Sequence, residues 1–562
     1  MNTSSHSEAP APSVPESAPT HWSSRRRILR VLLGIGVSLV TLIALFYLEE
    51  DWRGKHAWNA YAHQMTQQGE VFEFKAVAPP PVPDDQNFAM TPFLAPLFDF
   101  LPGTQTWRDT NATQRTMQFG NKLASMSDQI GDWRQGQRTD WPVCQAALAA
   151  AALGGKNWKT PPSVRPQAAL AAAALGRTNR SAHAEPDAAK PPPATNQLEA
   201  AAAVLATLKE YEPVLAELRA ASQRPHSRFN IRYDEEESAG ILLPHLAVIK
   251  KFGRMLALRA SAELTLNQPE SALADLEFAS YLADAVRNEP FLISQLVRCA
   301  MIQLAMQPVW EGLADRKWTE AQLQALQQRL GKFDFLADGA SAMRGERACG
   351  NSFIAYVRRN PEKLRDLGPS EGDVFKTHVA SEVGAKLMPR GWFYLEQINF
   401  NRLFSEATQP GVDYGTRRLN PSIMQQQEKA LGESLRTGWS PLLNHRLMSV
   451  MLLPALTKAQ LRFALTQTIL DEAILACALE RYRLANGRYP DSPAELAPRF
   501  VAKLPHDLIT GEPLKYRRTD NGRFILYSVG SNEKDDGGLI AKTSGKSPRL
   551  DSTQGDWVWP SP

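Results

Sequence analysis

The sequence predicts a mainly α-helical protein with a single N-terminal transmembrane helix, a helical body and a small C-terminal α+β module. Residues 31–48 carry no charge, which is typical of a membrane span. Residues 198–336 place apolar side chains at helical spacing, which predicts packed helices. After residue 450 the pattern changes from one long helix to short strand-like runs separated by turn residues, which predicts a separate α+β module.

The anchor is expected at residues 25–48, after a disordered cytoplasmic tail of residues 1–24. At about 1.5 Å per residue, the uncharged run would form about 27 Å of helix, close to the hydrocarbon thickness of a bilayer. A cleaved signal peptide fits the sequence less well than an anchor, because no A-x-A-like cleavage site follows the run. A buried core helix also fits poorly, since charges flank the run on both sides. We therefore expect an uncleaved signal anchor.

Basic residues before the span set its expected orientation. They are Arg25, Arg26, Arg27 and Arg30, whereas acidic residues follow the span. Because basic residues mark the cytoplasmic flank, we expect a single-pass protein of the bacterial inner membrane. Its N-terminus would lie in the cytoplasm and its bulk in the periplasm.

Two irregular segments are expected to follow the anchor. Residues 49–140 should form a juxtamembrane helix and a Pro-rich linker, since the PPPVP run at 79–83 favours polyproline II. An apolar patch at 93–101 should dock on the folded body. Residues 141–197 are expected to be an Ala/Pro-rich low-complexity insertion, in which the decapeptide QAALAAAALG occurs twice.

Residues 198–450 are predicted to form the helical body. Its clearest unit is a pair of antiparallel helices within residues 250–287, with a turn at Asn267 and small residues such as Ala260 and Ala272 where the helices approach. This unit is similar to a tetratricopeptide repeat, although the usual aromatic and glycine positions are missing. The body is the expected contact surface for a protein partner.

Charged residues recur inside these helices. They could line an anionic groove, but structural ion pairs between packed helices are the favoured interpretation. The residues concerned are Arg254, Arg259, Glu263, Arg287, Glu289, Arg298, Arg344, Glu346 and Arg347.

Composition excludes few functions. Apolar residues make up 43% and charged residues 22% of the chain, which are globular values, and the net charge is +4. No basic stripe interleaved with aromatic residues predicts a nucleic-acid partner, and no small-molecule substrate is evident. The cysteines Cys144, Cys299, Cys349 and Cys477 form no CxxC pair. Disulfides are possible, but buried thiols are favoured.

Residues 451–562 contain the most specific chemical pattern. A long helix is expected from Leu456 to Ala485, followed by strands at 514–517 and 524–528 around a turn. The acidic, glycine-rich loop 530–538 then offers many oxygen atoms, and Ca²⁺ takes about six to eight oxygen ligands. The candidate metal ligands are Asn532, Asp535, Asp536 and Asp556. The alternative is a solvated turn without a metal.

Four stretches carry a resemblance to a known family. They are ALERYRLANGRYPDSPAEL (478–496), LPHDLITGEPLKYR (504–517), FILYSVGSNEKDDGG (524–538) and GDWVWP (555–560). These resemble the C-terminal part of the major pseudopilin of type II secretion. In that family a long helix packs on a small antiparallel sheet, and the closing loop binds calcium through aspartates and backbone carbonyls.

The chain departs from the family pattern in its loop and in its membrane segment. It places Asn532 where the family has Asp, and Asp556 at the family's later aspartate. The apolar segment lacks the Glu of a pilin helix, so we do not expect processing or polymerisation as a pilin. The stretches PPPVPDDQNFAMTP (79–92) and EPFLISQLVRCAMIQLAMQPVWEGL (289–313) lie outside the C-terminal module. With them, the whole chain resembles an uncharacterised family of membrane-anchored bacterial proteins, which implies no activity.

No catalytic motif is present, since the chain contains no GxSxG, HExxH or Walker A sequence. We therefore expect no enzyme and no catalytic residue. The first hypothesis is a membrane-anchored extracytoplasmic binding or scaffold protein, linked to type II secretion or envelope assembly, with a calcium-type loop. The alternative is a metal-dependent extracytoplasmic hydrolase that uses Asp507, Asp535 and Asp536.

Overall fold

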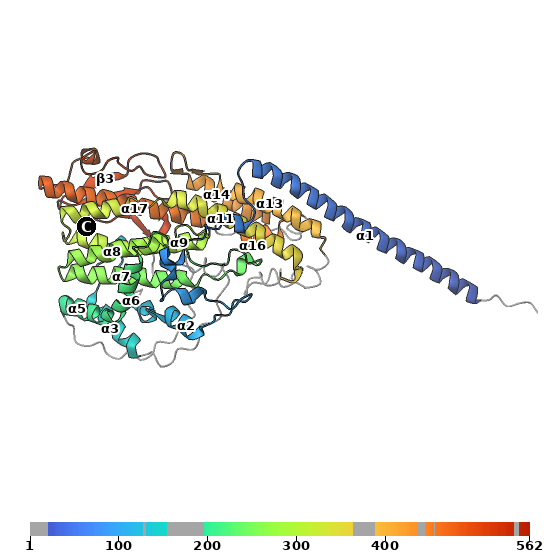
Figure 1. Ribbon diagram of the computed structural model, residues 1–562. Helices are drawn as coiled ribbons and strands as arrows, with labels where there is room; N and C mark the ends of the chain where they lie inside the picture. Colours follow the sequence, from blue (N-terminus) through green and yellow to red (C-terminus); the bar gives the residue numbers. More distant parts are fainter. Residues whose placement is uncertain are drawn as a thin grey trace, which may run out of the picture.

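The computed structural model describes residues 21–126, 131–153, 196–363, 388–435, 444–453, 456–543 and 550–561. Within these ranges the chain is mainly helical, and small antiparallel sheets lie near its C-terminus. Figure 1 shows one long helix projecting from a body of packed helices. The predicted combination of an N-terminal apolar helix, a helical body and small C-terminal sheets is therefore confirmed. The cytoplasmic tail to residue 20 and the second copy of the decapeptide lie outside the described residues.

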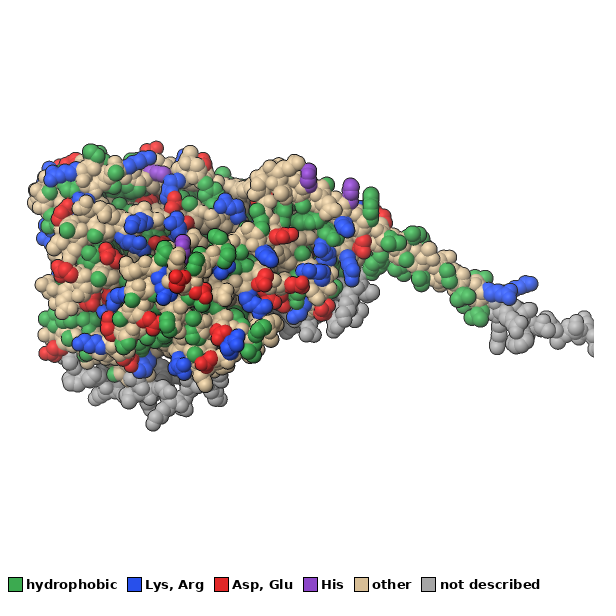
Figure 2. All heavy atoms as spheres, in the orientation of Figure 1, with side chains coloured by type: hydrophobic (Ala, Val, Ile, Leu, Met, Phe, Trp, Pro, Cys, Tyr) green, Lys and Arg blue, Asp and Glu red, His purple; other side chains and the backbone are tan. Residues whose placement is uncertain are grey.

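Helix α1 (His21–Gln67) is one continuous helix of 47 residues. Its apolar part is long and apolar enough to cross a membrane, and none of that part is buried by the body. Hydrophobic side chains cover the projecting part of the helix (Figure 2). The expected span and the expected juxtamembrane helix are thus two halves of the same rod, because no helix-breaking residue separates them.

The chain after α1 wraps around the body in short turns. Its elements are η1 (Phe74–Val77), η2 (Asp84–Gln86), η3 (Phe88–Met90), η4 (Ala95–Phe98), α2 (Thr110–Gln118), η5 (Asn121–Met126) and η6 (Trp133–Gln135). Phe74, Phe88, Leu94 and Leu97 are buried, so the predicted docking of the 93–101 patch is confirmed. The Pro-rich run also lies against the body, where the Arg228 side chain donates to the Pro79 carbonyl at 3.1 Å.

The helical body continues from this wrap. Its elements are α3 (Trp141–Leu153), α5 (Gln197–Leu208), η7 (Lys209–Tyr211), α6 (Glu212–Ala221), η8 (Ser238–Gly240), α7 (Pro244–Thr265), α8 (Pro269–Asp284), α9 (Leu292–Ala314), α10 (Glu320–Leu330), α11 (Phe335–Arg359), α13 (Arg390–Thr408), α14 (Pro421–Leu435) and α16 (Leu447–Leu452). A two-strand ribbon, β1 (Val412–Asp413) and β2 (Arg418–Leu419), interrupts it.

Helices α7 and α8 form the predicted helical pair. Asn267 adopts a φ of 60°, in the left-handed region that ends a helix and that Asn tolerates. Ala260 and Ala272 are fully buried between the helices, where small side chains permit close approach. The turn and the small-residue interface are confirmed, and the similarity to a tetratricopeptide repeat stays a prediction.

The C-terminal elements are α17 (Leu456–Asn486), η10 (Pro493–Leu496), β3 (Lys515–Arg518), β4 (Phe524–Ser528), β5 (Ile540–Lys542), β6 (Leu550–Gly555) and β7 (Trp557–Trp559). Strands β3, β4 and β7 form one antiparallel sheet, and β5 pairs with β6. Residue Lys515 lies opposite Tyr527, so the predicted hairpin is present.

These C-terminal elements share the core of the body. Helix α17 packs on α9, α10 and α11, and the Trp559 ring lies 5.0 Å from the Trp133 ring. Trp310 also donates from Nε1 to the Pro560 carbonyl at 3.2 Å. The long predicted helix is therefore confirmed, and it is the element on which both the body and the sheet pack.

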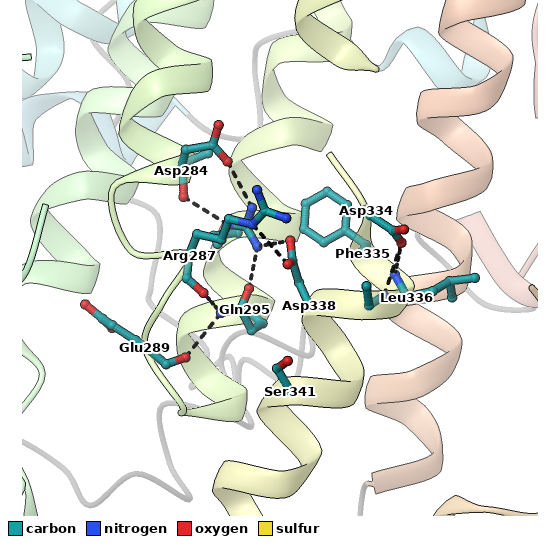
Figure 3. Close-up of polar contacts among 12 residues, drawn as sticks. Asp284, Arg287, Glu289, Gln295, Asp334, Phe335, Leu336, Asp338 and Ser341 are labelled. Carbon is teal, nitrogen blue, oxygen red and sulfur yellow. Dashed lines mark hydrogen bonds and ion pairs between the residues drawn. The ribbon is translucent and has the colours of Figure 1, made fainter. Parts of the chain in front are cut away.

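Buried charges in the body form structural networks, as the favoured interpretation predicted. Arg298 is fully buried and donates to Asp284 at 3.0 Å and to Asp338 at 2.8 Å. Figure 3 shows Asp284, Gln295 and Asp338 converging from α8, α9 and α11. A second network joins Arg259 to Asp275, whose pKa burial raises to about 6.

The cysteines form no disulfide, and all of them are buried. Burial raises the pKa of the Cys144, Cys299 and Cys477 thiols to about 12, because the thiolate loses its hydration. The favoured prediction of buried thiols is therefore confirmed, and the disulfide alternative is wrong.

Candidate functional site

The predicted metal loop connects β4 to β5, and Asp556 lies between β6 and β7. Glycines permit its path, because Gly537 and Gly538 adopt φ values of 75° and 83° that side chains with a Cβ rarely adopt. Residue Asp556 is 3% exposed. The sheet edge thus brings the loop and the later aspartate together, as the sequence predicted.

Three of the predicted ligands meet in this loop. The Asp556 carboxylate accepts the Asp536 N–H at 3.2 Å and the Gly538 N–H at 2.6 Å. Asn532 donates from its side-chain nitrogen to Asp536 at 2.8 Å. Burial, opposed by these two backbone hydrogen bonds, raises the pKa of Asp556 above its usual range. Asp536 and Asp556 thus lie close together, whereas Asn532 presents its amide nitrogen to Asp536 and its oxygen accepts the Lys534 N–H at 3.2 Å.

Asp535, the fourth predicted ligand, turns away from this group. Its carboxylate accepts the Tyr527 hydroxyl at 3.0 Å and the Gly537 N–H at 3.1 Å. Lys515 lies 3.6 Å from its other oxygen. The Gly537 and Tyr527 hydrogen bonds lower the pKa of Asp535, because they favour its charged form.

Asp507, Asp535 and Asp536, the acids of the hydrolase alternative, also do not come together in one site. Asp507 accepts the Ser528 hydroxyl at 2.9 Å and the Val529 N–H at 3.1 Å, which holds it inside the module. Glu472, which lies near Asp507, is fully buried. Burial, followed by repulsion from Asp507, raises the pKa of Glu472 well above its usual range. Among the described residues, no group of three or more His, Cys, Asp or Glu is arranged to hold a metal ion.

The buried histidine of α7 is structural. His245 stacks on Phe229 with ring centroids 4.2 Å apart, and its Nε2 lies 2.7 Å from Glu289. The Ser294 hydroxyl donates to the same Glu289 carboxylate rather than to the histidine. Because the carboxylate separates serine from imidazole, this trio lacks the contact by which a histidine activates a nucleophile.

A junction between α1 and α13 could not be predicted from the sequence. A Cβ on Gly54 would lie 2.2 Å from the Gly391 carbonyl oxygen, and a Cβ on Gly391 would lie 2.0 Å from the Glu50 carbonyl oxygen. Asp51 accepts the Gly391 N–H at 2.6 Å, and Glu50 accepts the Trp392 indole N–H at 3.0 Å. The only signal in the sequence was Gly54 inside the predicted juxtamembrane helix, and its partner Gly391 is visible only in the fold.

The junction also borders a basic cavity lined by side chains from α1, α11 and α13. Adjacent arginines at the end of α11 were its only sequence signal. Comparison of the chain with protein-family models, with curated proteins and with solved structures gave no match.

Proposed function

We propose that this chain is a single-pass protein of the bacterial inner membrane whose body acts outside the cytoplasm as a binding or scaffold unit. The observation that carries the proposal is helix α1, which is exposed and apolar along its first half and locked to the body along its second half. Such a helix positions everything that follows it at a membrane surface.

The exposed half of α1 supports anchoring. Leu33 and Leu48 are 68% and 66% exposed, and the large apolar side chains between them are also exposed. Monomeric soluble proteins rarely expose a continuous apolar surface of this size to water. A bilayer removes that cost, and the basic residues before the span favour a cytoplasmic N-terminus.

The docked half of α1 supports a scaffold role. Since α1 runs without a break from the span into the contact with α13, the body cannot swing freely on a linker. The distance between bilayer and body is then nearly fixed, which suits the presentation of a surface to an envelope partner. The pseudopilin resemblance suggests a type II secretion or envelope assembly as that partner. No arrangement among the described acids favours the hydrolase alternative.

Site-specific photo-cross-linking tests this proposal. A photo-reactive residue in place of Leu539, which is 68% exposed, is expected to give a discrete adduct with an envelope protein. The same substitution in an L39R/L42R chain should lose most of that adduct, because each central arginine opposes insertion by about 3 kcal/mol. The measurement is adduct yield in the membrane fraction of intact cells.

An L39A/L42A chain is the control, because it keeps the span apolar and should retain the adduct. Adducts with cytoplasmic proteins alone would contradict the proposed orientation. A lack of adducts from both Leu539 and the exposed Tyr414 would contradict the binding role.

We also propose that the C-terminal loop binds calcium through Asn532, Asp536 and Asp556. Calcium at about 100 times its dissociation constant should then stabilise the full chain by about 2.7 kcal/mol. D536N is expected to abolish most of this gain, whereas D535N should keep it, because Asp535 is held by Tyr527 and Lys515. Thermal unfolding with calcium and with magnesium measures the effect. Equal responses from D535N and D536N would contradict this ligand set.

A further inference from the structure

A cavity of about 310 Å³ lies where α1 joins the body. Its volume is at the small end of ligand sites, which span about 300–1,000 Å³. The lining residues come from the second half of α1, the end of α11 and the start of α13. They are Asp51, Lys55, Arg358, Arg359, Arg390 and Tyr394.

The lining of this cavity carries an excess of positive charge. It holds four basic side chains against one carboxylate, that of Asp51, which already accepts the Gly391 N–H at 2.6 Å. Within the described parts of the chain, Lys55, Arg358 and Arg390 form no ion pair, and Arg359 lies 3.6 Å from Glu236. Among the described residues, the cavity thus offers one carboxylate to four cations.

Helix electrostatics account for only part of this arrangement. Arg358 and Arg359 occupy the last turn of α11, where the helix dipole favours cations. Arg390, however, is the first residue of α13, where the dipole disfavours a cation. An anion in the space between Arg390 and the three other basic groups would relieve the repulsion among them.

The side chains in the cavity suit a phosphate group. Arg358 lies over the Tyr394 ring at 4.0 Å, and this stacking fixes the guanidinium at the cavity wall. Burial lowers the pKa of Arg358; Tyr394 opposes this effect, and the charges of Arg359 and Arg390 add to it. A guanidinium presents a planar fork of N–H donors that matches phosphate oxygens, and the lysine adds a mobile donor.

The position of the cavity identifies the source of the phosphate. Asp51 and Lys55 follow Leu48 by three and seven residues, or about 4.5 and 10.5 Å along α1. The headgroup layer extends about 5–8 Å beyond the hydrocarbon on each side. Helical side chains lean toward the N-terminus, so Lys55 points back to the bilayer. Basic side chains also gather beside the base of the projecting helix in Figure 2.

We propose that this cavity binds the phosphate headgroup of an anionic phospholipid in the leaflet from which α1 emerges. The proposal rests on α1 crossing the bilayer. A bound headgroup would neutralise Arg390 and Lys55 and fasten α1, α11 and α13 to one another at the membrane surface. The lipid is thus a structural ligand that sets how the body stands on the bilayer.

The test uses the full chain in detergent micelles, with lipid retention measured by native mass spectrometry. Phosphatidylglycerol is expected to bind, phosphatidylcholine is expected to bind far more weakly, and K55Q/R390Q should weaken phosphatidylglycerol binding by about 30-fold. This figure follows from about fivefold for each basic residue near an anionic lipid surface. Both replaced side chains are exposed, so the variant should fold.

The matched control is R115Q/K503Q, which also removes one arginine and one lysine from exposed positions but should leave retention unchanged. Equal retention of the two lipids, or equal losses in both double variants, would overturn the proposal. If millimolar inorganic phosphate displaced bound phosphatidylglycerol as effectively as added lipid does, the cavity would be a site for a free anion. That result would overturn the proposal that a lipid supplies the phosphate. Because the assay uses solubilised protein and no partner, its result is separate from that of the cross-linking test.

Discussion

Replacement of Arg298 by Met is expected to lower the free energy of unfolding by about 3–5 kcal/mol. Arg298 is fully buried, and its guanidinium donates to Asp284, to Asp338 and to the Ala283 carbonyl. Methionine fills much of the same volume but supplies no donor. The cost comes mainly from leaving two carboxylates with fewer partners inside the body, not from the attraction that is lost.

Arg287 provides the internal control, because it donates to the same Asp338 carboxylate at 3.0 Å from a side chain that is 43% exposed. R287M should cost about 1 kcal/mol or less, since water can replace an exposed partner. Urea unfolding of the full chain in detergent measures both variants. Similar losses from R298M and R287M would contradict the structural role of the buried network.

A double-mutant cycle separates the interaction between Arg298 and Asp338 from the contacts that each residue makes with its other neighbours. In R298M/D338L the carboxylate is removed together with its partner, so the loss should be smaller than the sum of the two single losses by about 1–3 kcal/mol. Additive losses would show that Arg298 and Asp338 are not coupled. The cycle would also show how firmly α9 is joined to α11, which carries the basic end of the cavity.

The sequence could predict those elements that depend only on residues close to one another in the chain. The left-handed turn at Asn267 depends on neighbouring residues alone. The long uncharged run and the hairpin of β3 and β4 are equally local. Such features are fixed by backbone and solvation preferences that do not require knowledge of the fold.

Contacts between distant segments could not be predicted. The ring of Trp559 packs on that of Trp133, so the C-terminal module shares a core with the body although its sequence pattern suggested a separate unit. Within the metal loop, the sequence supplied four oxygen-bearing residues, but it could not show that Tyr527 and Lys515 draw Asp535 away. Long-range partners decide where a side chain points.

The junction of α1 and α13 is the clearest contact between distant segments that the sequence could not predict. G391A is expected to destabilise the contact between anchor and body by about 3 kcal/mol, the upper part of the usual range for overpacking. The new Cβ would lie 2.0 Å from the Glu50 carbonyl oxygen, and a backbone atom cannot move aside as a side-chain end can. Hydrogen exchange of the amides at the start of α13 measures this loss.

G432A is the control within the helical body, because a Cβ on Gly432 meets no atom within 4 Å. It should leave exchange unchanged, and G54A should resemble G391A because both glycines belong to one contact. Separation of α1 from α13 would also carry Lys55 away from Arg390 and so abolish phosphatidylglycerol retention without removing any charge. Retention that survives G391A while exchange rises would show that the cavity does not depend on the junction. Loss of phosphatidylglycerol retention together with faster exchange would establish that the glycine contact builds the lipid site.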